Sequence, residues 1–234
     1  MKRTQIESAW HGAARCKNCA IRHLVLFADV KQEVFDHMHL PIDDIEYQPG
    51  HRIYLQGDIL PFAYTIRSGM IKLVQRLPNG DTRIVRILGQ GDLAGLESLD
   101  GSAMDHDAIS MDHVKVCRIP KSVIEMLKRD SPEIHSALLQ RWQKALTSAN
   151  NWITRLSTGT SKARVARLLM LLHETSEDDS FFLPVREDMG DMLGLTTESV
   201  SKATAEFKRQ GLLIEVHKQR ACINKDTLHK MFCE

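Results

Sequence analysis

The pattern of apolar and polar positions divides the chain into three parts. Between Ile45 and about Ile119, short runs of β-branched and other apolar residues alternate with turns that contain glycine. From about Ser131 to Leu156, apolar residues recur every three or four positions, which is the period of an amphipathic helix. Shorter helical and strand-like patterns alternate after that. The pattern predicts a β-rich body, one long helix and a mainly helical C-terminal domain.

The β-rich part is predicted to be a small barrel or roll. Asn79-Gly80 separates the apolar run 70–74 from the run 83–87, and Asn-Gly between two such runs is a strong hairpin signal. Many short strands with glycine at the corners are typical of closed or rolled antiparallel sheets. The turn glycines are Gly50, Gly57, Gly69, Gly80, Gly89, Gly91, Gly95 and Gly101.

The stretch from Met189 to Lys202 has the pattern of a helix, a tight turn and a second helix. Gly190 lies where the two helices must cross closely. Gly194 falls where the first helix must end, and glycine enters the left-handed conformation without steric cost. Thr196 is a good N-cap for the second helix. This is the pattern of a helix-turn-helix, and it predicts sequence-specific DNA binding.

The second helix of this motif has an apolar and a polar face. Val200, Ala203 and Phe207 recur at helical spacing and are predicted to face inward. The start of such a helix enters the major groove, where a carboxylate can accept from cytosine and a lysine can donate to guanine. The plainer alternative is two ordinary amphipathic helices, which the glycine offsets disfavour. The candidate DNA-binding residues are Thr197, Glu198, Ser201 and Lys202.

The segments around this motif predict a winged domain. A helix is expected at 162–174 and a short strand at 181–185. Strands at 212–216 and 221–223, joined by the basic bridge 217–220, are expected to form a β wing. Residues 157–161 form a hinge-like break before this domain.

The apolar stripe of the long helix has the alternating four-and-three spacing of a coiled-coil seam. It can pair with the same stripe of a second copy or pack on the roll of its own chain. We favour a homodimer, because a two-fold DNA reader needs a two-fold axis. The predicted seam consists of Leu138, Trp142, Ala145, Ala149, Trp152 and Leu156.

Composition adds few constraints. The 234 residues allow one large or two modest domains, and the net charge of +1 does not mark a nucleic-acid binder, so phosphate contacts are expected to be local. No apolar run approaches transmembrane length and no secretory leader is visible, so we expect a soluble, cytoplasmic protein without a membrane partner. Five cysteines, an odd number, do not suggest a secreted disulfide framework.

Five motifs make the chain resemble the family of the cyclic-AMP receptor protein and the FNR oxygen regulator, with the FNR branch as the best match. The resemblance extends over nearly the whole chain. It implies an α+β protein with a cyclic-nucleotide-binding-type β-roll, a long dimerisation helix and a C-terminal winged helix-turn-helix, acting as a transcription regulator and not as an enzyme. The motifs are residues 64–72, 91–95, 116–120, 164–169 and 193–202.

Four domains follow from the pattern and the resemblance together. Residues 1–28 form a cysteine-containing arm, and 29–130 form the β-roll sensor domain, with a short helix expected at 28–39. Residues 131–157 form the dimerisation helix. Residues 158–234 form the winged helix-turn-helix.

The resemblance also implies a DNA site and a protein partner. The recognition helix of the FNR branch carries a Glu-x-x-Ser-Arg pattern, and Glu198, Ser201 and Lys202 take those places. An inverted repeat of TTGAT-like half-sites is implied. Lysine at 202 keeps the charge but loses the bidentate fork, so the guanine contact is expected to be weaker or the preference altered. The family's roll contacts RNA polymerase through a loop that here includes Gly80 and Asp81.

The resemblance leaves the signal open. Members that bind a cyclic nucleotide place an Arg-Ser pair where the stretch 102–108 stands here. Asp107 would repel a phosphate and His106 is a poor substitute, so we do not expect cyclic AMP as a ligand. The acidic stretches 105–107 and 112–113 are interpreted as solvated loops in preference to metal sites.

FNR-type proteins hold a [4Fe-4S] cluster with three N-terminal cysteines and one in the roll. Cys16 and Cys19 match the first two and Cys117 matches the distal one, but Val25 stands in the third place and cannot ligate. A thiol–disulfide switch between the arm and Cys117 is the second alternative. The third is a cofactor-free, constitutive regulator in which Cys117 is a small buried apolar residue.

A rival of a different class is a cupin-like small-molecule or metal-binding protein built on a similar glycine-rich roll. Such a protein needs clustered histidines on adjacent strands, and the strand region lacks a His-x-His motif. It also has no use for the polar face of the second helix of the helix-turn-helix. The sequence therefore favours the DNA-binding regulator.

Overall fold

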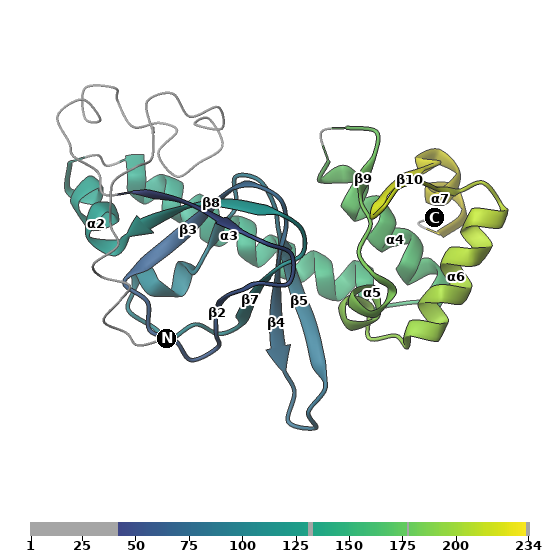
Figure 1. Ribbon diagram of the computed structural model, residues 1–234, viewed down its shortest axis with the longest axis horizontal. Helices are drawn as coiled ribbons and strands as arrows, with labels where there is room; N and C mark the ends of the chain where they lie inside the picture. The colour runs from purple at the N-terminus through teal and green to yellow at the C-terminus, as the bar shows by residue number, and fades with distance from the viewer. Residues whose placement is uncertain (1–41, 131–132, 177, 233–234) are drawn as a thin grey trace. The chain divides into compact units, whose positions relative to one another are not determined.

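The computed structural model describes residues 42–130, 133–176 and 178–232 (Figure 1). The predicted arm, the short helix at 28–39 and the residues Cys16, Cys19 and Val25 lie outside the described residues. Contacts within the described part divide it into two compact units. One unit contains residues 42–75 and 87–146, and the other contains residues 76–86 and 147–232.

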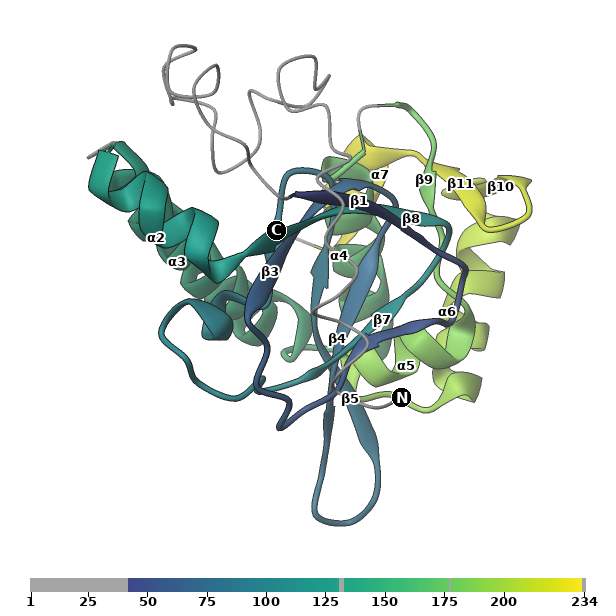
Figure 2. The same ribbon diagram turned by 60° about the vertical axis from the view of Figure 1, so that its left-hand side comes forward.

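Residues 43–120 form a roll of two four-stranded antiparallel sheets, as the glycine-punctuated pattern predicts. The sheets have the strand orders β1-β8-β3-β6 and β2-β7-β4-β5. Strands β4 and β5 form a long hairpin whose loop carries Gly80 at a φ of +89° (Figures 1 and 2). The strands are β1 (Asp43–Tyr47), β2 (Arg52–Tyr54), β3 (Phe62–Ser68), β4 (Ile71–Arg76), β5 (Thr82–Leu88), β6 (Leu93–Ala94), β7 (Asp107–Ser110) and β8 (Val114–Pro120).

Two helices, α2 (Lys121–Asp130) and α3 (Glu133–Asn151), follow the roll and complete its core. Leu127, Ile134 and Leu138 are buried in one cluster with Ala63 and Ile119 of the sheet. Burial of such side chains is the main stabilising term, at about 1.5–3 kcal/mol for each large one. The apolar face of α3 near its start therefore belongs to the roll.

Polar contacts hold α3 in one rotation about its axis. Arg141 donates to the Gly91 carbonyl at 2.8 Å, and the Lys144 ammonium lies 2.6 Å from an Asp92 carboxylate oxygen. Both acceptors lie in the turn before the short strand β6. These contacts determine which face of α3 meets the roll and which is left exposed.

The second unit is a winged helical domain. Its small sheet has the order β10-β11-β9. Its elements are α4 (Ser161–Glu174), β9 (Phe181–Phe182), α5 (Arg186–Leu193), α6 (Thr197–Arg209), β10 (Leu213–His217), β11 (Arg220–Ile223) and α7 (Lys225–Phe232).

The turn of the wing is shorter than the sequence predicts. His217 and Arg220, both expected in the basic bridge, are paired across the β10–β11 ladder. Only Lys218 and Gln219 remain as the turn, and Gln219 takes a φ of +60°. A two-residue turn with a positive φ matches the twist of the flanking strands, which explains why the ladder extends further than the apolar pattern.

The hinge-like break at 157–161 is braced by arginines. A π-helical turn, Trp152–Leu156, ends the long helix. Arg164 donates to the Leu156 carbonyl at 2.8 Å and Arg167 donates to the Arg155 carbonyl at 2.6 Å. Carbonyls at a helix C-terminus lack helical partners and carry partial negative charge, so two guanidinium groups stabilise this end. The break is a defined turn in the described residues.

Candidate nucleic-acid interface

The helix-turn-helix of α5 and α6 is built on two glycines, as the sequence predicts. A Cβ at Gly190 would lie 2.7 Å from the Leu195 carbonyl oxygen, a backbone atom in the turn. Gly194 caps α5 with a φ of +59°, and its N–H donates to the Gly190 carbonyl. The close crossing and the left-handed turn are confirmed.

The start of α6 is held by its cap and its buried face. Thr196 accepts a hydrogen bond from the Ser199 N–H at 3.2 Å, as expected of an N-cap. Val200, Ala203 and Phe207 are at most 2% exposed, so their inward orientation is confirmed. The opposite face of the first two turns of α6 is thereby directed outward.

The four predicted reading residues lie on the first two turns of α6. Thr197, Glu198 and Lys202 are exposed and Ser201 is half-buried. Glu198 and Lys202 form an ion pair of 2.6 Å, and their side chains are 74% and 76% exposed. An exposed pair at this spacing contributes about 0.3–0.5 kcal/mol. The pair therefore opens at little cost when a base edge competes for either group.

Several positive charges around α6 are paired with carboxylates. The Lys208 ammonium, with help from Arg186, holds the pKa of Glu215 below its usual value, and both cations lie 2.8 Å from it. Lys162 lies 2.7 Å from Glu206 and lowers the pKa of that carboxyl in the same way. This agrees with the near-neutral composition, from which only local phosphate contacts are expected.

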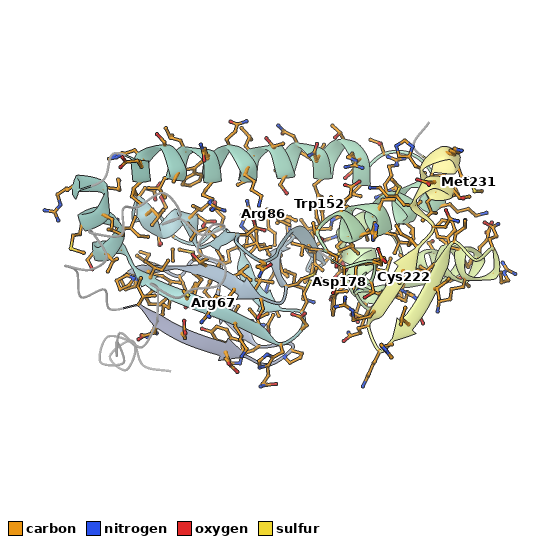
Figure 3. All side chains as sticks on the ribbon, turned by 90° about the horizontal axis from the view of Figure 1, so that it is seen from above. Arg67, Arg86, Trp152, Asp178, Cys222 and Met231 are labelled. Carbon is orange, nitrogen blue, oxygen red and sulfur yellow. The ribbon has the colours of Figure 1, made fainter. Side chains whose placement is uncertain are left out.

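Four of the six residues of the predicted dimer seam pack against other parts of their own chain. Leu138, Trp152 and Leu156 are at most 8% exposed, and Ala145 packs against the core cluster of the roll. Figure 3 shows Trp152 on the inner side of the long helix. The prediction that these four residues contact a second copy is wrong, because they already pack within their own chain. Only Trp142 and Ala149 remain exposed.

A second stripe on the long helix is exposed. Leu139, Trp142, Leu146 and Ile153 are 69%, 43%, 58% and 64% exposed, and Ala149 lies between the last two. These five positions follow the same alternation of three and four residues as the predicted seam. We call these five residues the outer stripe.

Cys117 lies in the middle of the β1-β8-β3 sheet. In the strand register it pairs with Asp44 on one side and Thr65 on the other. The half-buried thiol donates to the Asp44 carboxylate at 3.4 Å, and Arg67 lies 2.6 Å from the second oxygen of that carboxylate. A negative charge on the sulfur is therefore opposed by the carboxylate of Asp44.

In the roll, the stretch where family members place a phosphate-binding arginine carries a buried carboxylate. Asp107 is 5% exposed and accepts a hydrogen bond from the Gln56 N–H at 2.8 Å. The buried guanidinium of Arg118 binds Asp43 at 2.8 Å and lies over the Phe62 ring.

Comparison with known proteins agrees with this architecture. Residues 44–131 match the model of the cyclic nucleotide-binding domain, and residues 163–230 match that of the Crp-like helix-turn-helix domain. The chain belongs to the CRP/FNR family. Members of this family are DNA-binding transcription regulators and not enzymes, which removes the cupin-like alternative.

Individual relatives of the CRP/FNR family are similar over most of this chain. FnrL of Cereibacter sphaeroides, a transcriptional activator protein, is 27% identical over 209 residues, which are 85% of this chain and 84% of that protein. The fumarate and nitrate reduction regulatory protein of Escherichia coli is 25% identical over 226 residues, or 94% and 90% of the two chains. The structure of FixK2 from Bradyrhizobium japonicum matches with a TM-score of 0.73 at 25% identity, covering 81% and 96%.

The described residues show the surroundings of two positions at which the family resemblance raised a ligand. A buried Asp107 opposes a cyclic-nucleotide phosphate, and Arg118 is already paired. Of the positions considered for a [4Fe-4S] cluster, Cys16, Cys19 and Val25 lie outside the described residues, and the thiol of Cys117 lies beside the Asp44 carboxylate. Within the described ranges no group of three or more His, Cys, Asp or Glu side chains is arranged to hold a metal ion.

The outer stripe and the contacts of the β4–β5 hairpin were not found from the sequence. Leu139, Leu146 and Ile153 carry the same spacing signal as the predicted seam, displaced by one residue. Only the packing of α3 on the roll distinguishes the two stripes. Among the described helices none is long and apolar enough to cross a membrane.

Proposed function

We propose that this CRP/FNR regulator is a dimer that binds an inverted repeat of TTGAT-like half-sites. The observation that carries the proposal is the exposure of Glu198 and Lys202 on the first two turns of α6. The helix-turn-helix that holds them is built on Gly190 and Gly194. A carboxylate there accepts from a cytosine amino group and the ammonium donates to guanine. The likeness to FnrL and to the fumarate and nitrate reduction regulatory protein supports the same half-site.

Dimerisation through the outer stripe is part of this proposal. Large apolar side chains at alternating three- and four-residue spacing are the contacts of a two-stranded coiled coil. A two-fold pairing of the stripe gives each residue the same environment in both copies. The same two-fold axis would present two α6 helices to the two halves of an inverted repeat.

The second proposed partner is RNA polymerase, contacted by the loop between β4 and β5. Asp81 accepts from the Asn79 amide nitrogen at 2.8 Å and its own N–H donates to the Asn79 side-chain oxygen at 3.1 Å. The loop is thus a shaped surface that carries an exposed carboxylate. This supports the contact implied by the family resemblance.

The protein is expected to bind a duplex with an inverted TTGAT-like repeat more tightly than scrambled DNA. Glu198→Ala should remove base choice at one position of each half-site, at a cost of about 1–3 kcal/mol in discrimination, because the cytosine loses its acceptor. Fluorescence anisotropy over all four bases at that position measures this.

Glu187→Ala, which removes an exposed carboxylate from α5, is the matched control and should leave base choice unchanged. Equal affinity of the wild-type protein for the repeat and for scrambled DNA would refute the half-site. If Glu198→Ala weakens binding to all four sequences equally, the face of α6 that reads the bases has been assigned wrongly.

We further propose that the signal is a redox change at the thiols of Cys16, Cys19 and Cys117, without a [4Fe-4S] cluster. The support is the half-buried thiol of Cys117 and the valine at position 25. A disulfide between the arm and Cys117 forms when two thiols lose two protons and two electrons to a small disulfide oxidant by exchange. The exchange would tie the arm to β8.

Anaerobically purified protein should be colourless and free of iron. Oxidised glutathione should protect Cys117 from alkylation in the wild type but not in a Cys16→Ser/Cys19→Ser variant, as mass spectrometry of the labelled peptide would report. Asp44→Asn should speed alkylation of reduced Cys117, because it removes the charge that opposes a thiolate. A brown protein with about four irons per chain would establish the cluster. Unchanged alkylation after oxidation would favour the constitutive regulator.

A further inference from the structure

The outer end of the β4–β5 hairpin contacts the helix-turn-helix. Residues 76–86 group with the C-terminal unit, although the roots of both strands lie in the sheet of the roll. The Thr82 hydroxyl lies 3.0 Å from a carboxylate oxygen of Asp191 on α5, across 109 residues of sequence. A hydrogen bond from a hydroxyl to an ionised carboxylate is stronger than one between two neutral groups.

Arg83 occupies the space that Gly194 leaves open. A Cβ at Gly194 would collide with the guanidinium of Arg83. Gly194 is the C-cap of α5, so the positive charge of Arg83 stands at the end of the helix that carries partial negative charge. The lack of a side chain at Gly194 therefore allows the left-handed turn and also leaves room for an arginine of the hairpin.

Arg83 also acts electrostatically on Arg164, in the first turn of α4. Burial is the main cause that lowers the pKa of Arg164, and the positive charges of Arg83 and Arg167 lower it further. None of these three arginines forms an ion pair with a carboxylate in the described part of the chain. Three positive charges close together repel one another. The partial negative charges of the carbonyl groups at the C-terminal ends of α5 and of the long helix offset this repulsion.

We propose that Arg83 is a positioning residue for DNA binding. Its contact with Gly194 and the hydrogen bond from Thr82 to Asp191 hold the helix-turn-helix against the hairpin, and we call these two contacts the latch. The latch touches α5 and the turn, but Thr197, Glu198 and Lys202 on α6 stay exposed. It is thus compatible with bound DNA. Within this unit, the two contacts hold α5 and the turn before α6 in one orientation against residues 76–86.

The test is a cycle of Arg83→Ala and Gly194→Ala, with DNA affinity and hydrogen exchange as readouts. Gly194→Ala has two costs, an alanine at a positive φ and a collision with Arg83. Gly211 has a φ of +69° and open space where a Cβ would lie, so Gly211→Ala measures the cost of the positive φ alone. Arg86→Ala is the charge control, because Arg86 lies three residues along β5 from Arg83 and strand alternation puts it on the opposite face.

Each single variant at Arg83 or Gly194 should weaken binding by about five- to tenfold, and the double variant should be less than additive. In the Arg83→Ala background, Gly194→Ala should cost no more than Gly211→Ala does. Amides of the α5–α6 turn and of residues 76–86 should exchange faster in Arg83→Ala and not in Arg86→Ala. The exchange readout needs no DNA, so it is independent of the proposed half-site.

The salt dependence separates positioning from direct contact. A positioning residue leaves the slope of log affinity against log salt unchanged, whereas loss of a phosphate contact lowers its magnitude by about 0.9. Additive effects in the cycle, unchanged exchange in Arg83→Ala, or a lowered salt slope would each overturn the latch.

Discussion

Leu146→Glu is expected to convert the protein from dimer to monomer and to reduce its affinity for the inverted repeat by about 100-fold or more. In a two-fold pairing of the outer stripe, each introduced carboxylate would face apolar side chains and the same carboxylate of the other copy. An uncompensated buried charge costs about 3–5 kcal/mol, and each 1.4 kcal/mol is about tenfold in affinity. Sedimentation equilibrium and anisotropy measure the two effects.

Gln140→Glu is the matched control, because it adds the same charge to an exposed position of α3 that lies outside the outer stripe. It should leave both the mass and the affinity unchanged. The corresponding change at Leu138 would not discriminate, since that residue is 8% exposed and belongs to the core of the roll. A Leu146→Glu protein that remains dimeric would place the interface elsewhere.

Gly190→Ala is expected to destabilise the C-terminal unit by about 2–3 kcal/mol and to weaken DNA binding more than about tenfold. The added methyl would lie 2.7 Å from the carbonyl oxygen of Leu195. That oxygen is backbone in a tight turn and cannot rotate away, so α5 and α6 must separate. Thermal unfolding and anisotropy report the two effects.

Gly89→Ala provides the control for this change. Gly89 has an ordinary φ and nothing within 4 Å of an added Cβ, so alanine there should be tolerated. A Gly190→Ala protein with wild-type stability and affinity would show that the helices have room to cross at this point, contrary to the structure.

The DNA-binding end of the molecule was largely predictable because its signals are local. Gly190, Gly194, Thr196 and the apolar face of α6 each act within a few residues of sequence, and each was placed correctly. The hairpin signal of Asn79-Gly80 is local in the same way. Such features require only the geometry of a turn or of one helix.

The features that the sequence did not predict depend on long-range packing. Two stripes of α3 satisfy the same spacing rule, and the choice between them rests on Arg141 and Lys144 reaching the turn before β6. The partner of Arg83 is far away in the chain, at Gly194. The carboxylate beside Cys117 comes from Asp44, which only the strand register brings close. No local pattern contains this information.

The ion pair between Glu198 and Lys202 has a consequence for how the protein finds its site. Because the two charges cancel, the reading surface has little long-range attraction for the polyanion, and exposed pairs of this kind are screened further by salt. Non-cognate DNA then gains little from contact with these two side chains. A cognate half-site supplies a donor for one and an acceptor for the other at the same moment, so residence time and not capture rate should distinguish the correct site.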